Sequence, residues 1–468
     1  MKKLLFSFLC ILTLSTSVAM ATQATTPERE HEVAAMVASL EKKYDDAIAL
    51  YTQAIEINPQ NFLLYVNRAS VYSSLENYDL AIKDYDRAIE INPSFSLSYF
   101  NRGMFYENKL NDPEKAVLDY SKAIELEPNN ISYRSARSAT NLLGKKYSEV
   151  IIDLDKLIEL QPTLYKYYYI RGELHYLLKN YPAALKDYTT VLKLDPENSS
   201  VYLLRAKMYL QDRNFDSALE DLTKTIELAP HQSSPHYLRG LIYYAQEKYS
   251  PAINDLSQAI KLEPQNDNFY SIRSDLYRLN KNESNALKDI SKAIQLNPIK
   301  SQHYSKRCQL YFGSKKYDLA LKDINRALEL LTEDDKNTLA LYYAQRAWAY
   351  CYLQQYELAI PDYNRTIELL PDRAILFNDR AWTYYHMKNY DLALPDALKA
   401  LELDSKGAAI HDTIAWIYDA LGEKEKAIEH FEKYLVLAAS DDSYISKKES
   451  RDNVKKVEKR LKELKSGK

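Results

Sequence analysis

The chain has 468 residues, of which 46% are hydrophobic and 27% are charged, and its formal net charge is −3. A net charge this close to zero gives no indication of nucleic acid as a partner. Only 8 glycines accompany many Ala, Leu, Glu, Lys and Tyr residues, which favours helices joined by short turns, and the length excludes a single compact core.

The first residues read MKKLLFSFLCILTLSTSVAMA. Two lysines precede an apolar run from Leu4 to Val18, and a small-x-small cleavage pattern ends at Ala21. The run is short for a membrane span. Residues 1–21 therefore resemble a bacterial-type export signal, which predicts a periplasmic or secreted protein. An uncleaved membrane anchor is the alternative.

A 34-residue period follows the export signal. The stretches YDDAIALYTQAIEINP and YDLAIKDYDRAIEINP begin 34 residues apart, at Tyr44 and Tyr78, and 11 of their 16 residues are identical. Twelve repeats fit between Glu28 and Asp441. The prolines that mark the period are Pro59, Pro93, Pro128, Pro162, Pro196, Pro230, Pro264, Pro298 and Pro371.

Each repeat predicts two helices that turn near its fifteenth position. The eighth residue is small in all twelve repeats and the twentieth is Ala in eleven, so that the two helices can approach closely. The expected organisation is a signal over 1–21, repeats 1–9 over 28–334, an insertion or joint over 335–339, repeats 10–12 over 340–441 and a basic capping helix over 442–468.

This pattern resembles the tetratricopeptide repeat (TPR), a helix–turn–helix unit of 34 residues. The resemblance implies an all-α fold, a right-handed superhelical solenoid with a carboxy-terminal capping helix. It also implies binding of proteins or peptides, with the second, fifth, ninth and twelfth positions lining a concave groove. The Lys and Asn arrangement of the family's clamp for chaperone tails is not present at these positions.

The seventh and twenty-third positions of repeats 2 to 11 carry opposite charges. Because the two positions lie level across the hairpin, we predict an internal Arg–Asp ladder; a basic stripe for anions is the alternative. The arginines are Arg68, Arg102, Arg137, Arg171, Arg205, Arg239, Arg273, Arg307, Arg346 and Arg380. The aspartates are Asp84, Asp119, Asp153, Asp187, Asp221, Asp255, Asp289, Asp323, Asp362 and Asp396.

The last three repeats carry all three tryptophans, each at the ninth position. In the last two of these repeats, polar and aromatic residues hold the neighbouring fifth and twelfth positions. Aromatic planes would supply apolar contact, an asparagine would hold a peptide backbone, and the acids favour a ligand with a basic or amine feature. The alternative is that the indoles fill space between stacked helices. The predicted ligand groove consists of Trp348, Trp382, Trp416, Asn378, Tyr385, Asp412 and Asp419.

The tail from Ser443 to the end contains ten Lys or Arg residues and four Asp or Glu residues. Val454, Val457, Leu461 and Leu464 lie on one helical face. We expect a helix that caps the last repeat; peripheral contact with an anionic envelope surface is the alternative.

No motif predicts catalysis. The eight histidines are scattered, and the chain has no H-E-x-x-H pair, phosphate loop, nucleophile elbow or zinc-ligand spacing. We therefore expect a protein that is not an enzyme, with no catalytic residue, cofactor, metal site or nucleic-acid partner. Cys308 and Cys351 stand at unmatched positions of adjacent repeats and are expected to be free thiols.

Two functions remain open. The first is a non-enzymatic scaffold or adaptor, in the cell envelope or secreted, that holds a protein or peptide ligand in the concave groove. The alternative is a structural or assembly subunit of an envelope complex that makes its contacts through its outer faces.

Overall fold

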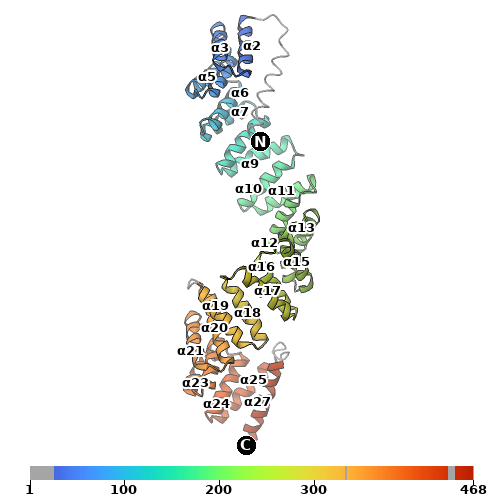
Figure 1. Ribbon diagram of the computed structural model, residues 1–468, viewed down its shortest axis with the longest axis vertical. Coiled ribbons are helices and arrows are strands. Elements are labelled where there is room, and N and C mark those ends of the chain that lie inside the picture. Colours follow the sequence, from blue (N-terminus) through green and yellow to red (C-terminus); the bar gives the residue numbers. More distant parts are fainter. Residues whose placement is uncertain (1–25, 332–334, 441–447, 467–468) are drawn as a thin grey trace. The chain divides into compact units, whose positions relative to one another are not determined.

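The computed structural model describes residues 26–331, 335–440 and 448–466, which form helices and turns without a strand (Figure 1). This confirms the predicted all-α architecture. The chain divides after Asn214 into two compact units. The predicted export signal over 1–21 lies outside the described residues, as do residues 441–447 at the start of the tail.

The first compact unit is a stack of helical hairpins in which each helix packs against its neighbours in sequence. Its helices are α2 (Pro27–Leu40), α3 (Tyr44–Ile57), α4 (Phe62–Ser74), α5 (Tyr78–Ile91), α6 (Ser96–Asn108), α7 (Pro113–Leu126), α8 (Ile131–Leu143), α9 (Tyr147–Leu160), α10 (Tyr165–Leu177), α11 (Tyr181–Leu194) and α12 (Ser199–Gln211).

The second compact unit continues the same pattern and ends with a helix of 19 residues. Its helices are α13 (Phe215–Leu228), α14 (Ser233–Ala245), α15 (Tyr249–Leu262), α16 (Asp267–Leu279), α17 (Glu283–Leu296), α18 (Ser301–Gly313), α19 (Tyr317–Leu330), α20 (Lys336–Tyr352), α21 (Tyr356–Leu369), α22 (Ala374–His386), α23 (Tyr390–Leu403), α24 (Ala408–Ala420), α25 (Lys424–Ala439) and α27 (Lys448–Ser466).

The hairpins are tight because small residues let the two helices touch. Gly172 of α10 shows this: a Cβ atom added there would lie 2.9 Å from the ring of Tyr188 on α11. Ala occupies the twentieth position of most repeats, and Ala47, Ala184 and Ala393 are completely buried there. The core is therefore a row of small clusters along the chain, not one central core.

The turn between the two helices of a repeat has one residue in the left-handed conformation, near the fifteenth position as predicted. Eleven of the twelve are not glycine, although this conformation costs an L-residue about 1 kcal/mol. They are Lys42, Glu76, Asn111, Lys145, Lys179, Arg213, Glu247, Lys281, Lys315, Gln354, Lys388 and Gly422.

The predicted Arg–Asp ladder is present. In each of the nine pairs that lie within one compact unit, Nε and Nη2 of the arginine donate to the two carboxylate oxygens at 2.6–2.9 Å. Arg239 and Asp255 are typical, with side chains that are 19% and 7% exposed. These arginines therefore bind inside the hairpin and do not form an open basic stripe.

Each ladder arginine also binds the preceding repeat, which the sequence analysis did not predict. Nη1 donates to a polar side chain sixteen residues earlier, or twenty-one where the insertion intervenes, at 2.6–3.3 Å. The ladder thus joins successive repeats as well as the two helices of one repeat. The acceptors are Thr52, Asp86, Ser121, Asp155, Thr189, Thr223, Ser257, Ser291, Asn325 and Asn364.

The ladder stops at the last repeat. Ile414 replaces the arginine and is completely buried, and Leu398 stands where the earlier repeats have a hydrogen-bond acceptor. His430 replaces the aspartate and forms a buried pair with His411, with 2.9 Å between the two Nδ1 atoms. Apolar packing and this histidine pair therefore hold the final hairpin.

Candidate functional site

Trp348, Trp382 and Trp416 occupy equivalent turns of three successive first helices, α20, α22 and α24. Trp348 is 38% exposed, and the other two indoles are less exposed but not buried. We call the surface formed by the fifth, ninth and twelfth positions of these helices the tryptophan face. Each indole is thus partly packed and partly accessible to solvent.

The indole of Trp348 reaches the next repeat. Its Nε1 atom donates to Oδ2 of Asp379 on α22 at 2.8 Å. Burial raises the pKa of Asp379 to about 6, although the hydrogen bonds from Trp348 and Asn378 favour its ionised form. Among the described residues, Asp379 forms no ion pair with Lys or Arg. This carboxylate therefore lacks the cation that would compensate its burial.

The middle of the tryptophan face is aromatic. Trp382 stacks on Tyr385, with 5.0 Å between ring centroids and 12° between planes, and meets His386 edge-on at 4.8 Å. Asn378 is only 6% exposed, and its Oδ1 atom has no hydrogen-bond partner in the described part of the chain. Contact between Asn378 and a peptide backbone would therefore require its side chain to turn outward.

Trp416 is held by polar and aromatic neighbours. Its Nε1 atom donates to Oδ1 of Asp412 at 2.9 Å, and its ring packs edge-on against Phe431 at 5.0 Å. The ammonium of Lys456, on α27, lies 4.4 Å from the ring centroid, which is a cation–π distance.

The two acids predicted to meet a basic ligand already bind α27. Asn453 Nδ2 donates to Oδ2 of Asp412 at 2.8 Å. Arg460 donates from Nε and Nη2 to the two oxygens of Asp419 at 2.8 and 2.9 Å. This contact and the neighbouring Glu463 raise the pKa of Arg460 further above its usual range. The chain therefore supplies its own basic group to this part of the tryptophan face.

The predicted groove residues thus fall into two groups. The first group comprises Asn378, Trp382 and Tyr385 on α22, of which the last two are in direct contact, together with Trp348, which reaches the same helix through Asp379. Asp412, Trp416 and Asp419 lie on α24 beneath α27. The role of all seven residues in ligand binding stays a prediction.

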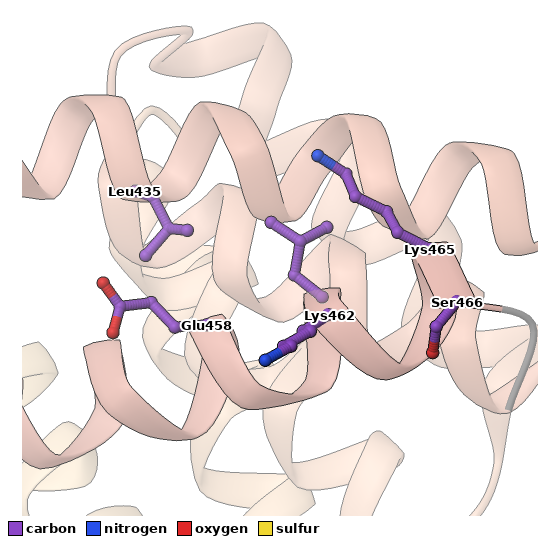
Figure 2. Close-up of a pocket in the computed structure, with 6 residues that line it drawn as sticks. Leu435, Glu458, Lys462, Lys465 and Ser466 are labelled. Carbon is purple, nitrogen blue, oxygen red and sulfur yellow. The ribbon is translucent and has the colours of Figure 1, made fainter.

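A shallow groove runs between α25 and α27 (Figure 2). Its base is apolar because Leu461 is nearly buried against α25, and its rim carries charged side chains. Lys465 on this rim forms an ion pair with Glu432 at 2.6 Å. The residues that line it are Leu435, Glu458, Leu461, Lys462, Lys465 and Ser466.

Among residues 26–331, 335–440 and 448–466, no cluster of three or more His, Cys, Asp or Glu side chains has a geometry for binding a metal ion. Within the same residues, no helix has the length and apolar character needed to span a membrane. Cys308 and Cys351 are free thiols, as predicted, and burial raises the pKa of both.

Family models match segments along most of the chain. The tetratricopeptide repeat models match residues 62–95, 84–117, 165–198, 234–266, 344–408 and 408–441, and a TPR repeat model matches residues 41–75. Together these segments span more than half of the sequence. The chain belongs to the tetratricopeptide repeat family.

No curated protein sequence matches this TPR protein significantly. Among solved structures it is similar to Naa15/Naa10 bound to HypK-THB, at 15% identity and a TM-score of 0.48 over 87% of this chain and 68% of that one. Yeast Tom70 is 18% identical, with a TM-score of 0.35 over 93% of this chain and 96% of that one. MamA is 25% identical, with a TM-score of 0.33 over 34% of this chain and 93% of that one. These likenesses are too distant to indicate a ligand.

The sequence analysis of this TPR protein missed four residues of the site. Asp379 stands at the sixth position, outside the positions that were compared between repeats. Asn453, Lys456 and Arg460 lie beyond the periodic part of the chain. One signal could have found two of them: Asn453 and Arg460 each follow their acidic partner by 41 residues, one repeat plus seven.

Proposed function

We infer that this TPR protein is a non-enzymatic scaffold that binds a protein or peptide on its tryptophan face, in the periplasm or after secretion. Partly exposed indoles at equivalent positions of three repeats support this inference. Aromatic side chains give large contact areas at low entropic cost, and they are enriched among the residues that dominate binding energies. The amino-terminal sequence supports the location.

Asp379 is the observation that carries the proposal. A partly buried carboxylate that forms no ion pair with a basic residue of the described chain would gain stability from a cation supplied by a ligand. The indole of Trp348 borders it and offers a face for the same cation. The ligand would therefore present a Lys or Arg side chain, or a terminal amine, between α20 and α22.

Capture from an extract of the native envelope tests the proposal with the full chain as bait. The variant Trp348→Ala/Asp379→Asn should capture about tenfold less protein than the wild type, or less still, as expected for a binding hot spot. The outer-face variant Leu118→Ala/Ile152→Ala is the matched control and should lose none. Circular dichroism would verify that both variants are folded.

The alternative function has its own observation. Leu118 on α7 and Ile152 on α9 are 70% and 61% exposed, at a position where most other repeats carry a charged or polar residue. Such an apolar pair on the outer side of the second helices favours a structural or assembly subunit. In the capture experiment this function predicts the reverse pattern, with loss in Leu118→Ala/Ile152→Ala and full capture by Trp348→Ala/Asp379→Asn.

Contact with an anionic envelope surface remains a second proposal for α27. The exposed side chains of Lys455, Lys459 and Lys462 supply positive charge on this helix. Co-sedimentation with vesicles rich in phosphatidylglycerol tests it; Lys455→Ala/Lys459→Ala should reduce the bound fraction, and unchanged binding would reject the contact.

A further inference from the structure

Helix α27 takes the place of a first helix of a thirteenth repeat, but it is built differently from the twelve that precede it. Its 19 residues include eight Lys or Arg, no aromatic residue and four apolar residues. Eleven of the twelve first helices of the repeats instead contain tyrosine. The six residues between it and the end of repeat 12 also interrupt the 34-residue period.

The apolar contact of α27 is narrow. Val457, Leu461 and Leu464 are 0%, 9% and 7% exposed, and they join a cluster with Phe431 and Tyr434 of α25. These three side chains recur every three or four residues, as on one stripe of an amphipathic helix. Any helix with the same stripe and the same length could occupy this surface.

The polar contact of α27 lies on the tryptophan face and is largely electrostatic. Arg460 binds Asp419 with two hydrogen bonds, Lys456 lies over Trp416, and Asn453 binds Asp412. The Arg460 side chain remains 35% exposed and Lys456 is exposed. The acidic partners lie deeper, since the Asp419 side chain is 12% exposed, but the basic groups of α27 are open to solvent, where salt and competing charges weaken an ion pair.

Earlier repeats make the corresponding contact between two fixed helices. Lys306 of α18 binds Asp275 of α16 at 2.6 Å, and Asp379 of α22 accepts from Trp348 of α20. At α24 the partner helix is instead a segment with a longer connection and a different composition. The last repeat therefore presents a helix-binding surface that the chain fills with its own tail.

We propose that α27 is an exchangeable occupant of this surface, and that the partner recognised there is a basic amphipathic helix of another protein that carries a Lys and an Arg one turn apart. This rests on the proposed function, because it assigns the ligand class of the α24 end of the tryptophan face. The partner helix would place its Arg on Asp419 and its Lys over Trp416, and would displace α27.

The test uses the full chain and a fluorescein-labelled synthetic peptide of residues 448–466. Lys456→Ala/Arg460→Ala weakens the intramolecular helix and leaves α24 intact. Fluorescence anisotropy should then show at least about tenfold tighter peptide binding than to the wild type. Lys455→Ala/Lys459→Ala removes the same charge from exposed positions of α27 and should bind the peptide as the wild type does.

A second pair of substitutions checks the surface itself. Adding Asp412→Asn/Asp419→Asn to the weakened chain should abolish the gain, because the peptide loses the same partners as α27. Equal peptide affinity for all the chains, or unfolding of the last repeat in Lys456→Ala/Arg460→Ala, would make α27 a fixed cap and overturn the proposal. A wild-type dimer that the peptide dissociates would identify a second copy as the occupant and would also overturn it.

The outcome is separable from that of the proposed function. The capture experiment depends on Trp348 and Asp379, which lie on α20 and α22, whereas the peptide experiment depends on α24 and α27. Failure of the peptide to bind with normal capture rejects the exchange alone. Normal exchange with failed capture rejects the proposed function of the α20–α22 region.

Discussion

Removing Arg239 should destabilise the second compact unit by about 2–4 kcal/mol. Its guanidinium donates to both oxygens of Asp255 and to Oγ1 of Thr223 in the preceding repeat. In Arg239→Ala the Asp255 carboxylate, 7% exposed, would keep only the contact with His236. Breaking a fully buried pair on one side costs about 3–5 kcal/mol, and the partial exposure of Arg239 reduces this.

The assay is urea unfolding followed by circular dichroism, with hydrogen exchange of α14 and α15 to locate the loss. In the double variant Arg239→Ala/Asp255→Ala no carboxylate is left unpaired, so the two costs should overlap by about 1–3 kcal/mol. Arg326→Ala is the control, because that exposed arginine forms a surface pair with Glu329, and surface pairs contribute little to stability. Strictly additive costs for Arg239 and Asp255 would refute the ladder as an energetic unit.

Three further predictions follow from local features. Lys281→Gly should raise the free energy of unfolding by about 1 kcal/mol, because Lys281 has a φ of 58° that glycine adopts without strain. Gly422 has a φ of 80°, so Gly422→Ala should lower the free energy of unfolding by a similar amount. Urea midpoints would measure both changes, and changes of the same sign would contradict the reasoning. Burial and His411 lower the pKa of His430 to about 4. The contribution of neutral His430 to the free energy of unfolding is therefore complete above pH 6.5 and is lost as the pH falls towards 4. Between pH 7 and 5 the free energy of unfolding of the wild type should fall by about 1–2 kcal/mol more than that of His430→Gln. Amino-terminal sequencing should find Thr22 first in protein from outside the cytoplasm, and Met1 on cytoplasmic protein would contradict export.

The repetitive part of the fold could be predicted because the same residue types recur at the same positions of each repeat. Small residues at the eighth and twentieth positions give close hairpins, and the joint appearance of arginine and aspartate identified the ladder correctly. The acceptors of the third hydrogen bond follow the same logic: Thr52, Asp86 and their equivalents precede an arginine by sixteen residues, and Leu398 precedes Ile414. Comparison of that position across repeats would have found them.

The carboxy-terminal contacts could not be predicted in the same way. Arg460 and Asp419 meet once, so no second copy supports the pairing, and the register of α27 depends on a connection that breaks the period. The raised pKa of Asp379 arises from burial between two repeats, which no single repeat reveals. Contacts that recur in every repeat can thus be predicted from the sequence period, whereas contacts that form only once are found from the structure.

The replacement of the ladder arginine by Ile414 in the last repeat has a mechanical consequence. Repeats joined by an arginine resist separation through directional hydrogen bonds, whereas Ile414 contributes apolar packing at the equivalent position. A force that pulls on the carboxy-terminal end would therefore load α27 first, and would then separate α24 and α25 from the preceding repeat before the repeats joined by arginines separate. A partner held on α24 would then be released under load before the preceding repeats of the second compact unit separate.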